Sequence, residues 1–174
     1  NNTNNMLLKG SCHCKKVAYT VETETPYAFA CCYCDICRKL NGGNGSNVNM
    51  LAKYKTLKVT AGKDNMTVYT VKGGSNHRSF CKDCGSFLYN YCPHYPDSLY
   101  PFASSIDTPL PEPKERVHFF LRSKPNWVTL HKTSDKDATF QKYPNEGLYD
   151  WHKKRNLLVV DDKEDKEDKE DNKE

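Results

Sequence analysis

The chain has 174 residues, a length that suits one domain. Apolar residues make up 37%, and the longest apolar runs, such as Leu157–Val160, fall far short of the roughly 20 residues that a membrane-spanning helix needs, so we expect no membrane partner. The net charge is +4, but residues 161–174 hold four Lys against nine Asp and Glu, so residues 1–160 carry +9. A basic body favours anionic partners, either an acidic small molecule or a nucleic acid backbone.

The two ends differ in composition from the middle. Asn1–Asn5 is polar and lacks the pattern of a secretory signal, so we expect a reducing compartment, the cytoplasm first and the nucleus second. Near the other end Lys-Glu-Asp repeats three times over residues 163–171, and such a segment cannot bury a core. We therefore predict a disordered lead over residues 1–6, one domain over 7–156 and a charged, disordered tail over 157–174.

The middle of the chain has the pattern of short strands. Residues 17–22 alternate apolar and polar side chains with period two. Gly73-Gly74 predicts a turn, and the proline-rich segment 92–116 leaves room only for short strands. No stretch keeps a helical period, so the sequence predicts a mainly β fold. The further predicted strands are 27–30, 48–51, 57–59, 67–71, 78–80, 87–89, 117–121 and 127–130.

Nine cysteines in a reducing compartment indicate metal binding or catalysis rather than disulfides. Cys81-x-x-Cys84 has the spacing with which two thiolates grip one zinc ion, and Gly85 can take the left-handed conformation that ends such a turn. Cys12 and Cys14 can supply the other two ligands. A closed site with four cysteines is structural, and it would clamp a small β domain.

The middle cysteine cluster, Cys32-x-Cys34-x-x-Cys37, offers three thiolates at close spacing. Three protein ligands leave a fourth position open for water or substrate, which is typical of a catalytic zinc. Cys31 could instead complete a second closed site, although adjacent cysteines bind one ion poorly. The lone Cys92 is expected to be a buried apolar side chain.

Four groups of residues carry a resemblance to the family of glutathione-dependent formaldehyde-activating enzymes, which includes centromere protein V. The resemblance covers roughly residues 8–144. It departs from the family pattern at Tyr33 and Cys31, where many relatives have histidine. The matching segments are Gly10–Cys14 with the strand that follows, Cys32–Lys39, Arg78–Leu88, and His118–Phe120 with Ser123–Val128 and Phe140–Pro144.

This resemblance implies a β fold of the Mss4-like, or β-tent, type and two zinc ions per chain. One zinc would be structural, and the second would lie where the thiol of glutathione and the aldehyde meet. The family's named reaction joins glutathione and formaldehyde into S-hydroxymethylglutathione, which is a carbon–sulfur lyase reaction run in reverse. The implied ligands are Cys12, Cys14, Cys81 and Cys84 for the structural ion and the catalytic Cys32, Cys34 and Cys37 for the second.

Three functions follow from these patterns. The first is an enzyme acting on thiol adducts, in which Arg38, Lys39, His77 and Arg78 are the candidates to contact the carboxylates of an anionic thiol such as glutathione. The second is a binding module with two structural zinc ions and a nucleic acid or acidic protein partner, although no basic block of five residues appears. The third is a redox protein, which the lack of a βαβ pattern beside Cys-x-x-Cys disfavours.

Overall fold

A computed structural model describes residues 4–41 and 43–159 of the chain. The mainly β prediction is confirmed: these residues form twelve short strands, two short α-helices and four 3-10 turns. The strands are β1 (Met6–Ser11), β2 (Ala18–Thr23), β3 (Ala30–Cys32), β4 (Asn47–Asn49), β5 (Ala52–Lys53), β6 (Lys58–Ala61), β7 (Met66–Thr70), β8 (His77–Cys81), β9 (Phe87–Tyr91), β10 (Ser98–Pro101), β11 (Val117–Phe119) and β12 (Ala138–Thr139). The helices are α1 (Asp35–Leu40) and α2 (Leu148–Lys154).

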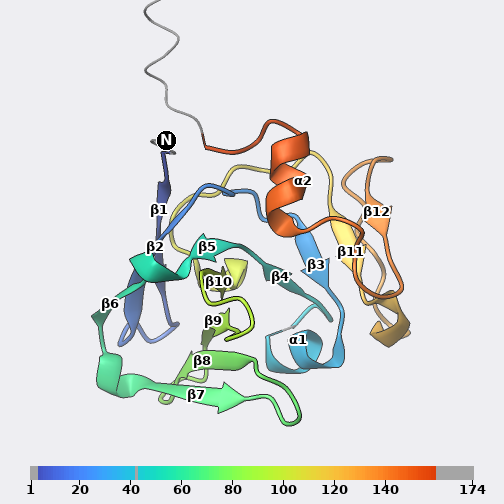
Figure 1. Ribbon diagram of the computed structural model, residues 1–174. Helices are drawn as coiled ribbons and strands as arrows, with labels where there is room; N and C mark the ends of the chain where they lie inside the picture. The colour runs from blue at the N-terminus through green and yellow to red at the C-terminus, as the bar shows by residue number, and fades with distance from the viewer. Residues whose placement is uncertain (1–3, 42, 160–174) are drawn as a thin grey trace, which may run out of the picture.

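The strands form three sheets. In Figure 1 the sheet with β1 lies at the left, the sheet with β8 in the middle and the sheet with β11 at the right. The first has the order β1-β2-β6, the second β5-β10-β9-β8-β7, and the third β12-β11-β3-β4. The first two are antiparallel, whereas β11 runs parallel to both β3 and β12 in the third. Helix α1 follows β3 directly, so the end of β3 places the middle cysteine cluster between sheets.

Strand β2 shows why these sequences form strands. Tyr19, Val21 and Thr23 are buried on one face, while the residues between them are only half-buried, as the period-two pattern predicts. The buried face of β2 meets Leu8 of β1 and Leu88 of β9 in the main core. This core joins the first sheet to the second without any helix.

A second core lies under α2. Trp151 stacks on Phe29 with the ring centroids 3.6 Å apart, and Val117 of β11 packs beside them. Figure 1 shows α2 at one end of β3 and β11. The helix has seven residues, so its apolar side chains do not repeat often enough for a helical period to stand out in the sequence.

Some predicted elements differ from the structure. The predicted strand 127–130 is not a strand, because Pro125 begins a turn in which the Val128 N–H donates to the Pro125 carbonyl (3.2 Å). Of the predicted run 27–30, only Ala30 belongs to a strand. The turn at Gly73-Gly74 is confirmed, with Gly73 at φ 75°.

The ends of the described chain are tied to the sheets. β1 begins at Met6, and the Val159 N–H donates to the Glu24 carbonyl (3.0 Å). Most of the predicted tail, from residue 160 onward, lies outside the described residues, so the domain limits stay a prediction. In the part of the chain that the structure describes, neither helix has the length and apolar character of a membrane span.

Candidate metal centres and the adjoining cavity

The cysteines of the first and third motifs come together between two sheets. Cys12 and Cys14 follow β1, whereas Cys81 ends β8 and Cys84 lies in the next turn. Their four Sγ atoms lie within 4.8 Å of one another, with Cys12 and Cys14 at 3.5 Å and Cys14 and Cys81 at 3.8 Å. A tetrahedral zinc with Zn–S near 2.3 Å holds its sulfurs about 3.8 Å apart, so this thiol set fits zinc.

Two tight turns aim these thiols at one point. The Gly85 N–H donates to the Cys81 carbonyl (2.8 Å), and Gly85 has φ 72°, the left-handed conformation expected from its sequence position. On the other side the Lys15 N–H closes a turn onto the Cys12 carbonyl (3.0 Å). The hydroxyl of Ser86, followed by the backbone of Cys14, lowers the pKa of Cys84 to about 5, which favours the thiolate that binds metal.

The middle cysteines form the second thiol group. The Sγ atoms of Cys32, Cys34 and Cys37 lie within 4.8 Å of one another. Cys34 caps α1, and its sulfur accepts the Cys37 N–H (3.4 Å). Hydrogen bonds from the Cys32 and Cys37 thiols lower the pKa of Cys34, because they stabilise its thiolate. The pKa of Cys32 is raised instead, because its hydrogen bonds with Cys34 and Cys37 and its burial favour the protonated thiol. The three thiols fit a zinc ion with one position left for another ligand.

A buried arginine lies beside this group. Arg78 is 6% exposed, and its Nη2 donates to Cys37 Sγ (3.3 Å). The guanidinium also lies 5.2 Å from the ring centroid of Phe102. Its Nε and Nη1 are buried and have no hydrogen-bond partner among the described residues. A buried cation with free donors next to three thiols is suited to hold an anion.

The three thiols of the middle cysteine cluster and Arg78 line one cavity of 890 Å³. At the end that holds the cysteines, Arg78 is joined by Asn90, its cross-strand neighbour on β9, and by Asn76, whose Oδ1 accepts from Asn90 Nδ2 (2.9 Å). The other end is aromatic. Its lining includes Phe29, Phe119, Phe120, Phe140, Tyr143 and Trp151.

Known proteins similar to this chain share one family description. The family described as glutathione-dependent formaldehyde-activating enzyme matches residues 7–123. The chain belongs to this family. A Halomonas elongata protein that carries the provisional name of a glutathione-dependent formaldehyde-activating enzyme is 40% identical over 156 residues, which cover 87% of this chain and 98% of that protein. A crystal structure of a Rhodobacter sphaeroides protein matches 59% of this chain and 91% of its own, with 25% identity and a TM-score of 0.48.

The mainly β architecture, with cysteine pairs that join two sheets, fits the Mss4-like fold expected for the formaldehyde-activating family. Among the predicted substrate contacts, Arg78 lines the cavity and the other three residues do not. Arg38 pairs with Asp35 (2.7 Å) on α1, and Lys39 is exposed. His77 lies half-buried with its Nδ1 3.1 Å from Thr70 Oγ1.

The two residues expected to depart from the family pattern, Cys31 and Tyr33, do not line the cavity. Because side chains alternate along β3, Cys31 and Tyr33 lie on the opposite face from Cys32, in a separate small core. The Tyr33 hydroxyl lies 3.0 Å from His118 Nδ1, and His118 Nε2 lies 3.7 Å from Asp137 Oδ2. Cys31 is therefore not part of either thiol group of this family member.

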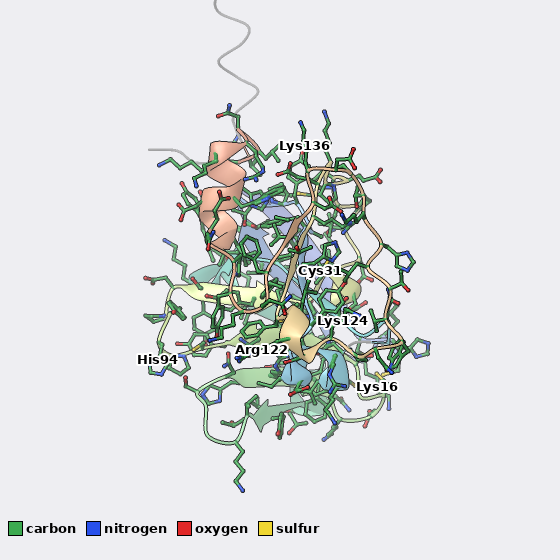
Figure 2. All side chains as sticks on the ribbon, turned by 90° about the vertical axis from the view of Figure 1, so that its right-hand side faces the viewer. Lys16, Cys31, His94, Arg122, Lys124 and Lys136 are labelled. Carbon is green, nitrogen blue, oxygen red and sulfur yellow. The ribbon has the colours of Figure 1, made fainter. Side chains whose placement is uncertain are left out.

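Figure 2 shows Cys31 inside the molecule, seen through the face that the third sheet presents. The labelled cations on this face are spread over its height: Lys136 lies near the top, Arg122 and Lys124 near the middle, and Lys16 lower down.

Sequence reasoning did not find the amides or the rings of the cavity. Asn76 and Asn90 carry no motif, although Asn90 is buried in β9 two residues after the core residue Leu88. Trp151 and Arg155 come from the last described segment, far along the chain from the cysteines. Only tertiary packing brings them to the same cavity.

Proposed function

We propose that the chain is a zinc-dependent carbon–sulfur lyase-like enzyme, which makes and breaks the adduct between glutathione and formaldehyde. The observation that carries this proposal is the meeting of three free thiols and a buried, partly unpartnered arginine in one cavity. Cys32, Cys34 and Cys37 would hold the catalytic zinc. When bound, such an ion supplies a Lewis acid that can hold a thiolate or polarise a carbonyl oxygen.

The protein's own residues orient the substrate. The free donors of Arg78 suit a carboxylate of glutathione, because a guanidinium binds carboxylates with paired hydrogen bonds. The amide of Asn90 lies next to Arg78 on the neighbouring strand and offers an unpartnered, buried oxygen to an N–H of the peptide. With its carboxylate on Arg78 and its peptide on Asn90, glutathione points its thiol at the cysteines. This placement lowers the entropic cost of the reaction.

In the reaction itself, the sulfur of glutathione forms a bond to the carbonyl carbon of formaldehyde, the carbon–oxygen π bond breaks, and the thiol proton ends on the oxygen. The reverse reaction returns both molecules. No oxidant or reductant is needed. A second zinc at Cys12, Cys14, Cys81 and Cys84 would hold the first two sheets together without taking part in this chemistry.

The test is the exchange between glutathione and its hydroxymethyl adduct, followed by NMR at equilibrium. We expect wild-type protein to speed the exchange and Cys34→Ser to return it to the uncatalysed background. Cys31→Ala is the matched control, since it removes a neighbouring thiol that faces the other side of β3. Exchange by wild-type protein at the background rate would overturn the proposal.

A further inference from the structure

The aromatic end of the cavity has no task in a reaction of formaldehyde. Small-molecule cavities usually measure about 300–1,000 Å³, and this one has 890 Å³. Formaldehyde adds a single carbon to the sulfur. Beyond the cysteines the cavity continues along Phe119, Phe120 and Phe140, so space remains where the aldehyde's own substituent would point.

The rings at this end are held in place by the backbone. Phe120 has φ 60° and ψ 37°, a left-handed conformation that is rare and strained for a bulky residue. Hydrogen bonds on both sides fix it: its N–H donates to the Lys142 carbonyl (3.0 Å), and the Leu121 N–H donates to the Phe140 carbonyl (3.1 Å). Tyr143 packs against the Phe120 ring edge to face at 4.6 Å. These contacts keep the Phe120 ring in the lining of the cavity despite its strained backbone.

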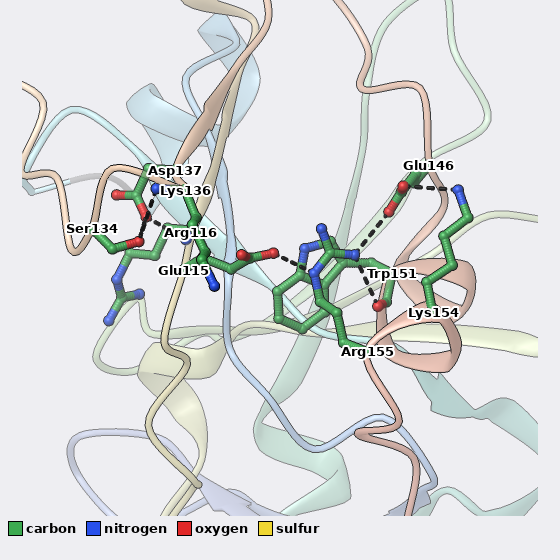
Figure 3. Close-up of polar contacts among 9 residues, drawn as sticks. All are labelled: Glu115, Arg116, Ser134, Lys136, Asp137, Glu146, Trp151, Lys154 and Arg155. Carbon is green, nitrogen blue, oxygen red and sulfur yellow. Dashed lines mark hydrogen bonds and ion pairs between the residues drawn. The ribbon is translucent and has the colours of Figure 1, made fainter.

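The charges nearby favour an uncharged ligand at this end. Arg155, the cation that lines it, is already paired with Glu115 and with Glu146 (3.1 Å), and it lies over the Trp151 ring at 4.5 Å. Figure 3 shows this arginine between the two carboxylates. A carboxylate of glutathione would therefore find its free donor at Arg78, at the end with the cysteines. What the aromatic end offers is apolar contact.

We propose that the aromatic end binds the substituent of a larger aldehyde, so that the substrates include adducts of glutathione with aromatic aldehydes. This inference rests on the proposed function and names the substrate class of the same site. The bond changes are those of the formaldehyde reaction: sulfur joins the carbonyl carbon, the π bond opens, and the thiol proton ends on the oxygen. The aromatic substituent is carried through unchanged.

The test compares two stable analogues, S-methylglutathione and S-benzylglutathione. The chain has two tryptophans, and Trp127 is 66% exposed, so Trp127→Phe leaves Trp151 as the reporter in the cavity wall. In this background we expect fluorescence titration to show S-benzylglutathione binding about tenfold or more tightly, because the ring leaves water. Phe140→Leu and Tyr143→Ala should reduce this preference severalfold and leave the affinity for S-methylglutathione unchanged. Tyr69→Ala, an exposed aromatic outside the cavity, is the control and should keep the preference.

Each other outcome counts against the inference. Equal affinities for the two analogues, with formaldehyde exchange still catalysed, would overturn the proposal that the substrates include larger aldehydes. The proposed function would still stand. A preference that survives both cavity variants would place the benzyl group elsewhere and overturn it as well. If neither analogue binds and exchange is not catalysed, the glutathione function falls, and the inference falls with it.

Discussion

In the proposed function, Arg78 is the residue that would connect the cysteines to the substrate, because it contacts Cys37 and lines the cavity. It lies on β8 three residues before Cys81. One strand therefore supplies both the cation of the cavity and a thiol of the clamp, the group formed by Cys12, Cys14, Cys81 and Cys84. Its position opposite Asn90 in the register of β8 and β9 gives the cavity a fixed polar end. Because the guanidinium is buried, its burial must be offset by contacts, and Cys37 Sγ is the one hydrogen-bond acceptor the described residues supply.

Arg78→Lys keeps the charge and removes the planar fork. We expect it to weaken the binding of glutathione by about tenfold or more, which corresponds to the roughly 1.5–3 kcal/mol of a hydrogen bond to a charged group. Calorimetric titration with glutathione measures this, with metal content determined on the same sample. Arg38→Lys is the control, since Arg38 pairs with Asp35 outside the cavity. Unchanged affinity in Arg78→Lys would remove Arg78 from the site.

His152 predicts a pH dependence of folding. Burial lowers the pKa of His152 from 6.5, because the charged imidazolium would lose its hydration in this nearly water-free position. Its Nε2 accepts the Tyr27 N–H (3.1 Å). The unfolded chain then binds this proton more readily than the folded chain, so stability is full above about pH 6.5 and falls as the pH drops below it.

We expect His152→Gln to flatten the fall in the free energy of unfolding between pH 7.5 and 5.5, by at most about 1.4 kcal/mol per pH unit. Urea unfolding at both pH values checks this. The slope will not vanish, because burial also lowers the pKa of His118. His131→Gln, at an exposed position, is the comparison. A slope equal to that of wild type would mean that His152 is not the sensitive group.

At the scale of elements, helix α2 is held by charges as well as by its tryptophan. Arg155 donates to Glu115, to Glu146 (3.1 Å) and to the Trp151 carbonyl (3.1 Å), as Figure 3 shows. Lys154 reaches only Glu146 (2.8 Å) and is mostly exposed. The two neighbours therefore form a matched pair, one with several half-buried contacts and one with a single surface contact.

Arg155→Met should lower the free energy of unfolding by about 1–2 kcal/mol, since it loses the contacts with both carboxylates and the cation–π contact. Lys154→Met should change it by less than about 0.5 kcal/mol, as surface ion pairs contribute little. Urea unfolding followed by circular dichroism measures both. Similar values for the two variants would show that Arg155 does not hold the helix.

Elements whose pattern is local could be predicted, and those that depend on distant partners could not. The alternation around Tyr19 and Val21 predicts β2, and Gly85 predicts the turn of the clamp, because both signals lie within a few residues. Residues 127–130 look like a strand, but none of the strands in the described part of the chain pairs with them. Strand β12 consists of Ala138 and Thr139, and its pairing with β11 decides its existence rather than its own composition.

For the whole molecule, the cysteine spacing predicts which thiols meet but not what surrounds them. Pairs such as Cys81 and Cys84 carry a local geometric requirement that is visible in the sequence. The aromatic end of the cavity joins Phe29 and Phe120 to Trp151, and no short pattern connects these positions. The same limit explains why three of the four residues predicted to contact the substrate, Arg38, Lys39 and His77, do not line the cavity.

The two thiol groups predict different consequences of losing a metal. The clamp connects β1 to β8 and β9 across two sheets, whereas Cys32, Cys34 and Cys37 all lie within one strand end and one helix. Protein purified without added metal or chelator should therefore contain two zinc ions per chain. Cys34→Ser should contain one and lower the midpoint of thermal unfolding by only a few degrees.

Cys84→Ser should remove the structural ion and abolish cooperative unfolding, because binding energy at such sites is folding energy, of order 10 kcal/mol in small zinc domains. Elemental analysis and thermal unfolding on the same samples test both variants. Excess chelator should remove the structural ion from wild-type protein and so abolish its cooperative unfolding, as Cys84→Ser does. The same should happen to Cys34→Ser, with a slower loss of the ion. If Cys84→Ser unfolds at the wild-type temperature, the main core alone holds the two sheets together. A single zinc in wild-type protein that Cys34→Ser retains would leave the cavity without its catalytic ion.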